Sequence, residues 1–235
     1  PRGRSLEHVE EIAGHEALTA YRSIFVRGAN PRLLVNPVLN PLQVKFLLAR
    51  EVGYQYLGLK ERSLTSTPDR IDSFGQIFND FKAAYFGGAL LMPRAPMLED
   101  LEKFFSRTLW DPQPLLDMVA RYEVTPEMLL YRFSELIPQF FGIRLHFLRL
   151  QYANGRYQLI KHLNMNQLVV PSGIGLYEHY CRRWLSVRLL QELASKDDVS
   201  TMETPHLGVQ LSDYLDTEDR FLCIGFARPL VLTPD

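Results

Sequence analysis

Apolar residues recur at three- and four-residue steps along much of the chain before residue 145. Between residues 5 and 27 this spacing predicts one or two amphipathic helices. The apolar positions in that stretch are Leu6, Val9, Ile12, Leu18, Tyr21, Ile24 and Phe25. The next periodic segment, 41–57, follows Asn40, which suits an N-cap, and it ends before Gly58, which suits a helix stop. Because 41–57 is apolar on most of its surface, we expect a buried helix.

Further helices are predicted at 74–91, 97–109, 115–122 and 126–141. The polar stretch 60–72 between the first two long helices is predicted to be a loop. In the helix 97–109 the residues expected to face inward are Leu98, Leu101, Phe104, Phe105 and Leu109. Near the end of 74–91, Gly87-Gly88-Ala89 leaves room for another backbone to approach closely.

The strand signals begin at residue 145. The segments 145–152 and 157–163 flank Asn154-Gly155, a pair typical of tight antiparallel hairpins. A helix is predicted over 176–193, centred on Cys181-Arg182-Arg183-Trp184, and strands over 206–211 and 220–226. We therefore predict an α+β protein, with an almost entirely helical domain at 1–144 and a small strand-rich α/β domain at 145–235.

Composition and charge narrow the class of protein. Hydrophobic residues make up 46% of the 235 residues and charged residues 23%, as in ordinary globular domains. The net charge of −1 excludes a global basic field for nucleic acid, and no apolar run approaches the ~20 residues that span a bilayer. Two cysteines, Cys181 and Cys223, are too few for a four-cysteine metal site and favour a reducing, cytoplasmic setting. The helix pair in 115–141 resembles a helix-turn-helix superficially but lacks an exposed Arg and Gln face.

The helix 41–57 carries an unusual charged motif, Arg50-Glu51-Val52-Gly53-Tyr54. A helical zinc peptidase site places histidines at positions four apart, with a glutamate next to the first as general base. Here those two positions hold Arg50, which would repel a cation, and Tyr54, an uncommon ligand. Only Glu51 retains the residue type that the chemistry needs, so we expect no catalytic residues.

Two segments together resemble the ImmA/IrrE family of bacterial zinc peptidase-like proteins. The first is Phe46 to Tyr54, where the family usually reads F-x-x-A-H-E-x-G-H. The second is Phe86 to Pro93, which ends in Ala-Leu-Leu-Met-Pro as the family's second helix does. Lys82 falls where an acidic third zinc ligand is common, and Asp80 is the nearest carboxylate. The resemblance implies a zincin-like fold whose degenerate site consists of Arg50, Glu51, Tyr54, Asp80 and Lys82, with no metal and no enzymatic activity.

The hairpin at 145–163 is followed by Ser172-Gly173-Ile174-Gly175 and Cys181-Arg182-Arg183-Trp184. This order resembles the start of the sensor domain in the short-chain fatty acyl regulators of the helix-turn-helix XRE type, which control fatty acid metabolism and respond to acyl-CoA. In these proteins the peptidase-like domain lies between a DNA-binding domain and a C-terminal sensor. The resemblance implies a ligand sensor in 145–235, a homodimer, and contact with DNA only through an N-terminal domain outside this chain. Family members with extra cysteines hold an iron–sulfur cluster, which the two thiols here do not supply.

The candidate ligand-binding residues lie in and before the helix 176–193. His179 and Arg183 are four residues apart, and Arg182 is one step round, so they could bind a CoA phosphate. Gly173 and Gly175 precede the helix and could present backbone N–H groups to a phosphate. A solvated basic face explains the same residues.

An alternative hypothesis is that four His and Cys residues converge on a metal ion, although their spacing matches no known ligand pattern. Those residues are His162, His179, Cys181 and Cys223. Separate structural roles account for them equally well.

The sequence therefore favours the effector region of a bacterial transcription regulator, catalytically inactive and binding a short-chain acyl-CoA. No cofactor other than that ligand is expected. Two alternatives stay open: an atypical zinc metallopeptidase using Glu51 with Tyr54 and Asp80, and a protein-interaction scaffold. We also expect that, if Arg50 and Glu51 pair with neighbours across the two helices, the former site has become a structural lock.

Overall fold

The computed structural model describes residues 9–11, 20–66, 71–153, 155–165, 184–195, 205–213 and 220–229. The chain divides into two compact units. Unit 1 contains the described residues up to 101 together with 120–125, and unit 2 contains 102–119 and the described residues from 126. The predicted domain boundary at 144/145 stays a prediction.

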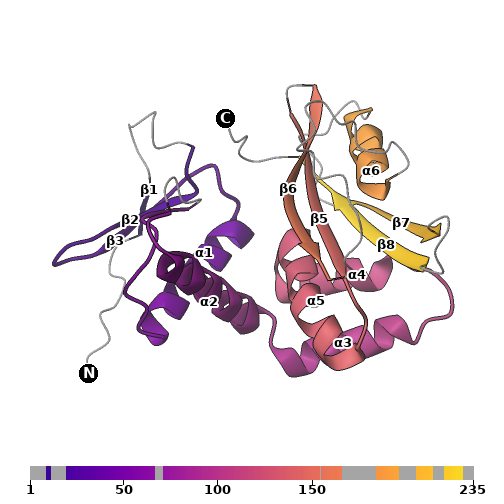
Figure 1. Ribbon diagram of the computed structural model, residues 1–235, viewed down its shortest axis with the longest axis horizontal. Coiled ribbons are helices and arrows are strands. Elements are labelled where there is room, and N and C mark those ends of the chain that lie inside the picture. The colour runs from indigo at the N-terminus through magenta and orange to yellow at the C-terminus, as the bar shows by residue number, and fades with distance from the viewer. Residues whose placement is uncertain are drawn as a thin grey trace. The chain divides into compact units, whose positions relative to one another are not determined.

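Unit 1 contains a small sheet that the sequence pattern did not predict (Figure 1). Its strands are β1 (Val9–Glu11), β2 (Ser23–Val26), β3 (Arg32–Val35) and β4 (Thr65–Ser66), in the order β1-β3-β2-β4. β1 is parallel to β3, and β2 is antiparallel to both β3 and β4.

The prediction of helices over 5–27 is therefore wrong where the structure describes the chain. The apolar and aromatic residues Ile24, Phe25 and Val26 are adjacent, and their type favours a strand. The turn that follows them contains Gly28 (φ 158°) and leads directly into β3, so the two segments pair. The expectation of an almost entirely helical chain before residue 145 fails for the same reason.

Helix α1 (Pro41–Tyr56) has the ends that its sequence predicts. The Asn40 side chain accepts a hydrogen bond from the Gln43 N–H, and the Gln43 side chain accepts one from the Asn40 N–H, each at 3.0 Å. Gly58 follows the helix with a φ of +62°. The helix is less buried than expected, since Val52 and Tyr56 are exposed.

Helices α1 and α2 (Phe74–Leu91) lie side by side in unit 1 (Figure 1). A Cβ on Gly87 would lie 3.1 Å from the backbone nitrogen of Arg50, so the predicted close approach is confirmed at this residue. Gly88 makes no such approach, and the other contact point is Gly53, whose added Cβ would lie 3.0 Å from the Ala83 carbonyl oxygen. Two glycines on facing helices thus bring the backbones together.

The sheet and α1 share one hydrophobic core. Its buried members come from β3, the turn after it and α1, with Val44 and Leu48 packed against them. They are Leu33, Val35, Leu39 and Leu47. This core fixes α1, and with it the charged motif, against the sheet.

Three further helices follow: α3 (Arg94–Phe105), α4 (Gln113–Tyr122) and α5 (Pro126–Phe141). Each lies close to its predicted range, but α3 ends four residues earlier than expected. Leu109 lies beyond the helix and is 82% exposed, so its predicted inward position is wrong. Leu101 and Phe104 are buried as expected.

Unit 2 contains two antiparallel hairpins. β5 (His146–Ala153) pairs with β6 (Arg156–Asn164), and β7 (His206–Asp213) pairs with β8 (Arg220–Ala227). Gly155 has a φ of +75°, as the predicted Asn-Gly turn requires. The strand predictions in this part of the chain are confirmed, and the mixture of helices and strands confirms the α+β class.

Helix α6 (Leu185–Ala194) packs on the second hairpin through Leu185, Leu189 and Leu193. Gly208 and Gly225 admit this contact, because an added Cβ on either would lie 2.8 Å from a Leu189 methyl carbon. Trp184 is the N-cap with extended backbone, so the prediction that places it at the helix centre is wrong. None of the described helices is long and apolar enough to cross a membrane.

Candidate functional site

The candidate site lies in unit 1, where the charged motif of α1 meets the segment before β4. Glu51, only 2% exposed, accepts two hydrogen bonds from the guanidinium of Arg62. One of them joins Nη1 of Arg62 to Oε2 of Glu51 at 2.6 Å, and the other joins Nη2 to Oε1. Both carboxylate oxygens of Glu51 are therefore occupied by one side chain.

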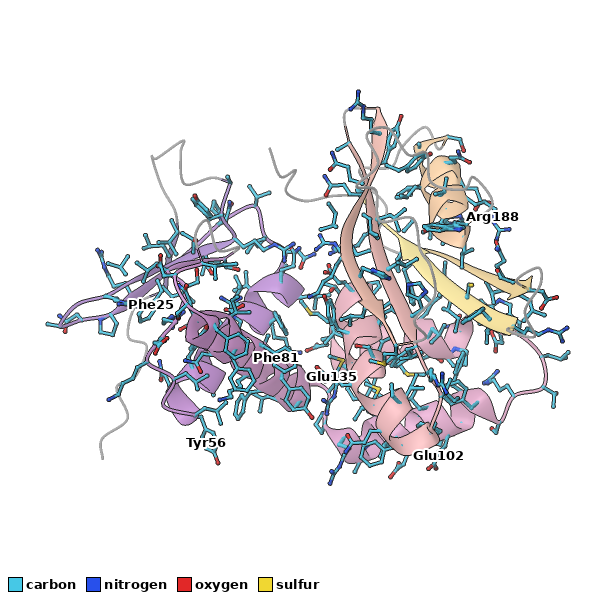
Figure 2. All side chains as sticks on the ribbon, in the orientation of Figure 1. Phe25, Tyr56, Phe81, Glu102, Glu135 and Arg188 are labelled. Carbon is cyan, nitrogen blue, oxygen red and sulfur yellow. The ribbon has the colours of Figure 1, made fainter. Side chains whose placement is uncertain are left out.

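Two aromatic rings enclose the Arg62 guanidinium. Its central carbon lies 3.8 Å from the ring centre of Phe25 on β2 and 4.0 Å from that of Tyr54 on α1 (Figure 2 labels Phe25). Both distances are within the range of cation–π interactions. Arg62 is itself buried, and its Nε has no hydrogen-bond partner in the described part of the chain.

The ion pair is a matched pair of buried charges. A buried carboxylate without a partner is strongly unfavourable, and a bidentate guanidinium is the partner that suits its geometry best. A pair of this kind adds little net stability compared with apolar residues, but losing one member is costly. Arg62 therefore locks the 57–64 segment onto α1.

A second cluster contains Arg50 and Tyr54, the two α1 positions at which the resembled motif has histidines, together with Asp80. The Tyr54 hydroxyl donates to Oδ1 of Asp80 on α2 at 2.7 Å, and Nη2 of Arg50 lies 3.5 Å from the same oxygen. Nη1 of Arg50 also donates to the Ser66 hydroxyl at 3.4 Å. The tertiary structure thus brings Arg50, Tyr54 and Asp80 together, as the sequence pattern predicts.

Burial, and then the charge of Asp80, raises the pKa of Tyr54 well above its ordinary value. The phenol therefore remains protonated at neutral pH and donates its proton to the Asp80 carboxylate. A tyrosine ligand would have to be a phenolate, which this environment disfavours.

Lys82 does not join the cluster. It is two residues from Asp80 on α2, a step that turns a helix by about 200°. Its Nζ lies 4.1 Å from the ring centre of Phe78. Lys82 also lines a shallow hollow together with Leu57, Phe81 and Tyr85. Of the five predicted residues, Arg50, Tyr54 and Asp80 are in contact with one another, Glu51 pairs with Arg62 instead, and Lys82 lies apart.

These residues do not fit a zinc ion. A zinc site needs neutral imidazoles, thiolates or free carboxylates converging on one point. Here one ligand position holds a guanidinium, the other a protonated phenol, and both Glu51 oxygens are engaged by Arg62. No group of three or more His, Cys, Asp or Glu residues suited to a metal is found among the described residues.

Sequence reasoning missed Arg62 and Phe25. Arg62 lies in a polar stretch with no periodicity, so no pattern marks it as buried. The available signal was Glu51 itself: a carboxylate on an apolar helix needs a cation, and Lys60 and Arg62 are the nearest cations after the helix.

The candidate ligand-binding residues of the sensor part lie outside the described residues. They are Gly173, Gly175, His179, Arg182 and Arg183. Two members of the alternative metal constellation, His179 and Cys181, also lie outside. Of the others, His162 faces His146 with 2.8 Å between their Nε2 atoms, and the Cys223 sulfur is 3.7 Å from the Ser212 hydroxyl.

Comparison with known proteins shows which family contains this chain. The family model described as the IrrE N-terminal-like domain, a peptidase family, matches residues 8–134. A search of curated proteins found no match. The matched range covers more than half of the chain and includes the whole candidate site, so the chain belongs to the IrrE N-terminal-like, or ImmA/IrrE-type, family.

Proposed function

We propose that this chain is the effector region of a bacterial transcription regulator whose peptidase-like domain has no catalytic activity. In this proposal the region binds a short-chain acyl-CoA and passes its ligand state to a DNA-binding domain outside this chain. The regulator acts as a dimer in the cytoplasm.

The proposal that the domain is inactive depends mainly on the hydrogen bonds made by Glu51. A general base must accept a proton from water, so it needs a free oxygen facing the reacting group. Both oxygens of Glu51 accept hydrogen bonds from Arg62, and Arg50 and Tyr54 are bound to Asp80 in place of a metal. This arrangement supports a structural role for residues that resemble a peptidase motif.

The acyl-CoA part of the proposal rests on the resemblance to fatty acyl regulators and on side-chain chemistry. CoA carries phosphates, and arginine binds phosphate through two parallel hydrogen bonds. Arg182 and Arg183 are adjacent in the sequence and lie directly before Trp184, the N-cap of α6. They are the residues expected to contact the CoA phosphates.

Thermal unfolding with ligands tests the binding. Propionyl-CoA and acetyl-CoA are expected to raise the unfolding midpoint, and free propionate is not. The double substitution Arg182→Ala with Arg183→Ala should abolish the shift, whereas Arg220→Ala, an exposed arginine paired with Asp213, should preserve it. If no acyl-CoA raised the unfolding midpoint, the proposal that the ligand is an acyl-CoA would be refuted.

Metal analysis tests the alternative of an atypical peptidase. We expect no stoichiometric zinc in the purified chain. Bound zinc, together with proteolysis that disappears in Glu51→Gln, would overturn the proposal in favour of an enzyme.

A further inference from the structure

One face of α2 exposes a continuous row of large apolar side chains. The row consists of Phe74, Ile77, Phe78, Phe81 and Tyr85, which we call the aromatic stripe. Each of these side chains is 43–76% exposed. The opposite face of α2, with Ala83 and Gly87, packs on α1, so the stripe is not the face that holds the helix in unit 1.

The rings of the stripe pack along the helix. The ring centres of Phe74 and Phe78 are 5.7 Å apart, and those of Phe81 and Tyr85 are 6.4 Å apart. The end of α1 extends the apolar surface through Tyr56 and through Leu57, which shares the shallow hollow with Phe81 (Figure 2 labels Tyr56 and Phe81). The result is one apolar surface rather than scattered single residues.

The area of this surface is that of a protein interface. An aromatic side chain has roughly 200 Å² of surface, so the stripe with Tyr56 and Leu57 exposes about 700 Å² of side chain. The largest apolar patch of a typical monomer is about 300–600 Å². A standard interface buries about 800 Å² on each partner, so two copies of this surface nearly supply it.

The spacing and charge of the stripe favour an identical partner. Phe74, Phe78, Phe81 and Tyr85 follow steps of four, three and four residues, the repeat by which one helix packs along another. The stripe contains no carboxylate, and the one carboxylate on α2, Asp80, faces Arg50 instead. The nearest cation, Lys82, lies on the flank of the stripe with its Nζ 4.1 Å from the ring centre of Phe78, so in a symmetric pair the two ammonium groups lie beside the contact and the rings of Phe74, Phe81 and Tyr85 form its centre.

We infer that the aromatic stripe is the surface through which two copies of this chain associate, α2 against α2 about a two-fold axis. The inference rests on the dimer in the proposed function and names its contact surface. It does not depend on the ligand.

Sedimentation velocity and light scattering on the 235-residue chain test the contact. The wild-type chain is expected to be a dimer, and Phe81→Glu should weaken it by at least about 100-fold, because the lost anchor and the added charge occur twice in a symmetric interface. Leu109→Glu is the matched control: Leu109 is also exposed but lies outside the stripe, so this variant should remain dimeric. Circular dichroism should show that all the variants are folded, since both sites are exposed.

Charge complementation tests the symmetry. Phe81→Glu and Phe81→Lys should each be monomeric alone and should form a heterodimer when mixed. Phe74→Ser, at the other end of the stripe, provides an independent variant without a charge.

Several results would overturn the inference. They are a monomeric wild-type chain up to its solubility limit, a Phe81→Glu variant as dimeric as wild type, and equal dissociation by Leu109→Glu. A monomer whose α2 amides are protected from hydrogen exchange would show that another part of the same chain covers the stripe. The acyl-CoA thermal shift measured on the Phe81→Glu monomer separates this inference from the proposed ligand, because either can fail alone.

Discussion

At the scale of single residues, the motif on α1 that resembles a peptidase site consists of charged and polar groups that pair with neighbouring side chains. Glu51 needs Arg62, and Asp80 is shared by Tyr54 and Arg50. The expectation of partners across the two helices is confirmed for Arg50, which pairs with α2. Glu51 instead finds its partner in the segment after α1.

Removing Arg62 should be the most damaging single truncation in this cluster. Arg62→Met leaves Glu51 buried without a cation and is expected to reduce the free energy of unfolding by about 3–5 kcal/mol. Replacing both residues, Glu51→Met with Arg62→Met, should recover most of this loss, because no buried charge remains. Urea unfolding of the two variants and of an Arg220→Ala control measures the difference. A single variant as stable as wild type would contradict the buried ion pair.

At the scale of elements, the two long helices of unit 1 are held together by glycines at their crossing. At Gly87 the three atoms nearest to an added Cβ all belong to the backbone of Ala49 and Arg50, whereas Gly53 meets the Ala83 carbonyl oxygen and the Phe86 side chain. Close packing of this kind leaves no space for a methyl group.

Gly87→Ala and Gly88→Ala form a matched pair that tests this contact. Alanine at Gly87 would press on the Arg50 backbone, so we expect a loss of about 1–3 kcal/mol despite the better helix propensity. Alanine at Gly88 meets nothing within 4 Å and should stabilise the helix by up to about 1 kcal/mol. Thermal unfolding distinguishes them, and equal effects would show that the crossing tolerates a methyl group.

The β5–β6 hairpin carries an element of pH dependence. Partial burial, and then the neighbouring His162, lowers the pKa of His146 below its ordinary value of 6.5. Near and below pH 6.5, His146 binds a proton more readily in the unfolded chain than in the folded hairpin. The free energy of unfolding should therefore fall as the pH falls from about 7 to 5. The free energy of unfolding should change by well under ~1.4 kcal/mol per pH unit, the value for a difference of one whole bound proton, because both imidazoles are partly exposed.

Urea unfolding of wild type and of His146→Gln across this pH range measures whether the free energy of unfolding falls with falling pH. The variant should lose part of the slope below pH 6.5 and should parallel wild type above pH 7.5. Identical slopes throughout would remove His146 as the cause.

At the scale of the whole molecule, the chain is expected to fold without a metal. Chelation unfolds proteins whose structural metal supplies the folding energy. Here the candidate site is held by ion pairs, so EDTA should leave the unfolding midpoint unchanged. A drop in the midpoint on chelation, restored by zinc, would show a metal site outside the described residues.

Local signals in the sequence were sufficient wherever one residue specifies a backbone conformation. Asn40 caps α1 and Gly58 follows its end, and Gly155 adopts the positive φ of the predicted hairpin. The shared face of Arg50 and Tyr54 was also readable, because helical periodicity places residues four apart on one face. Asp80 was indicated only by the resemblance to the family's second helix.

Only the tertiary structure decided which distant residues complete the site. Arg62 is polar, lies in a segment without periodicity, and becomes buried only because β2, α1 and the segment before β4 meet around it. The strands of unit 1 were not predicted for the same reason, since strands of two to four residues are stabilised by neighbours far along the chain. The sequence alone determined that Arg50 and Tyr54 occupy the positions where the resembled motif has histidines, and only the folded chain determined that a buried guanidinium occupies both oxygens of Glu51.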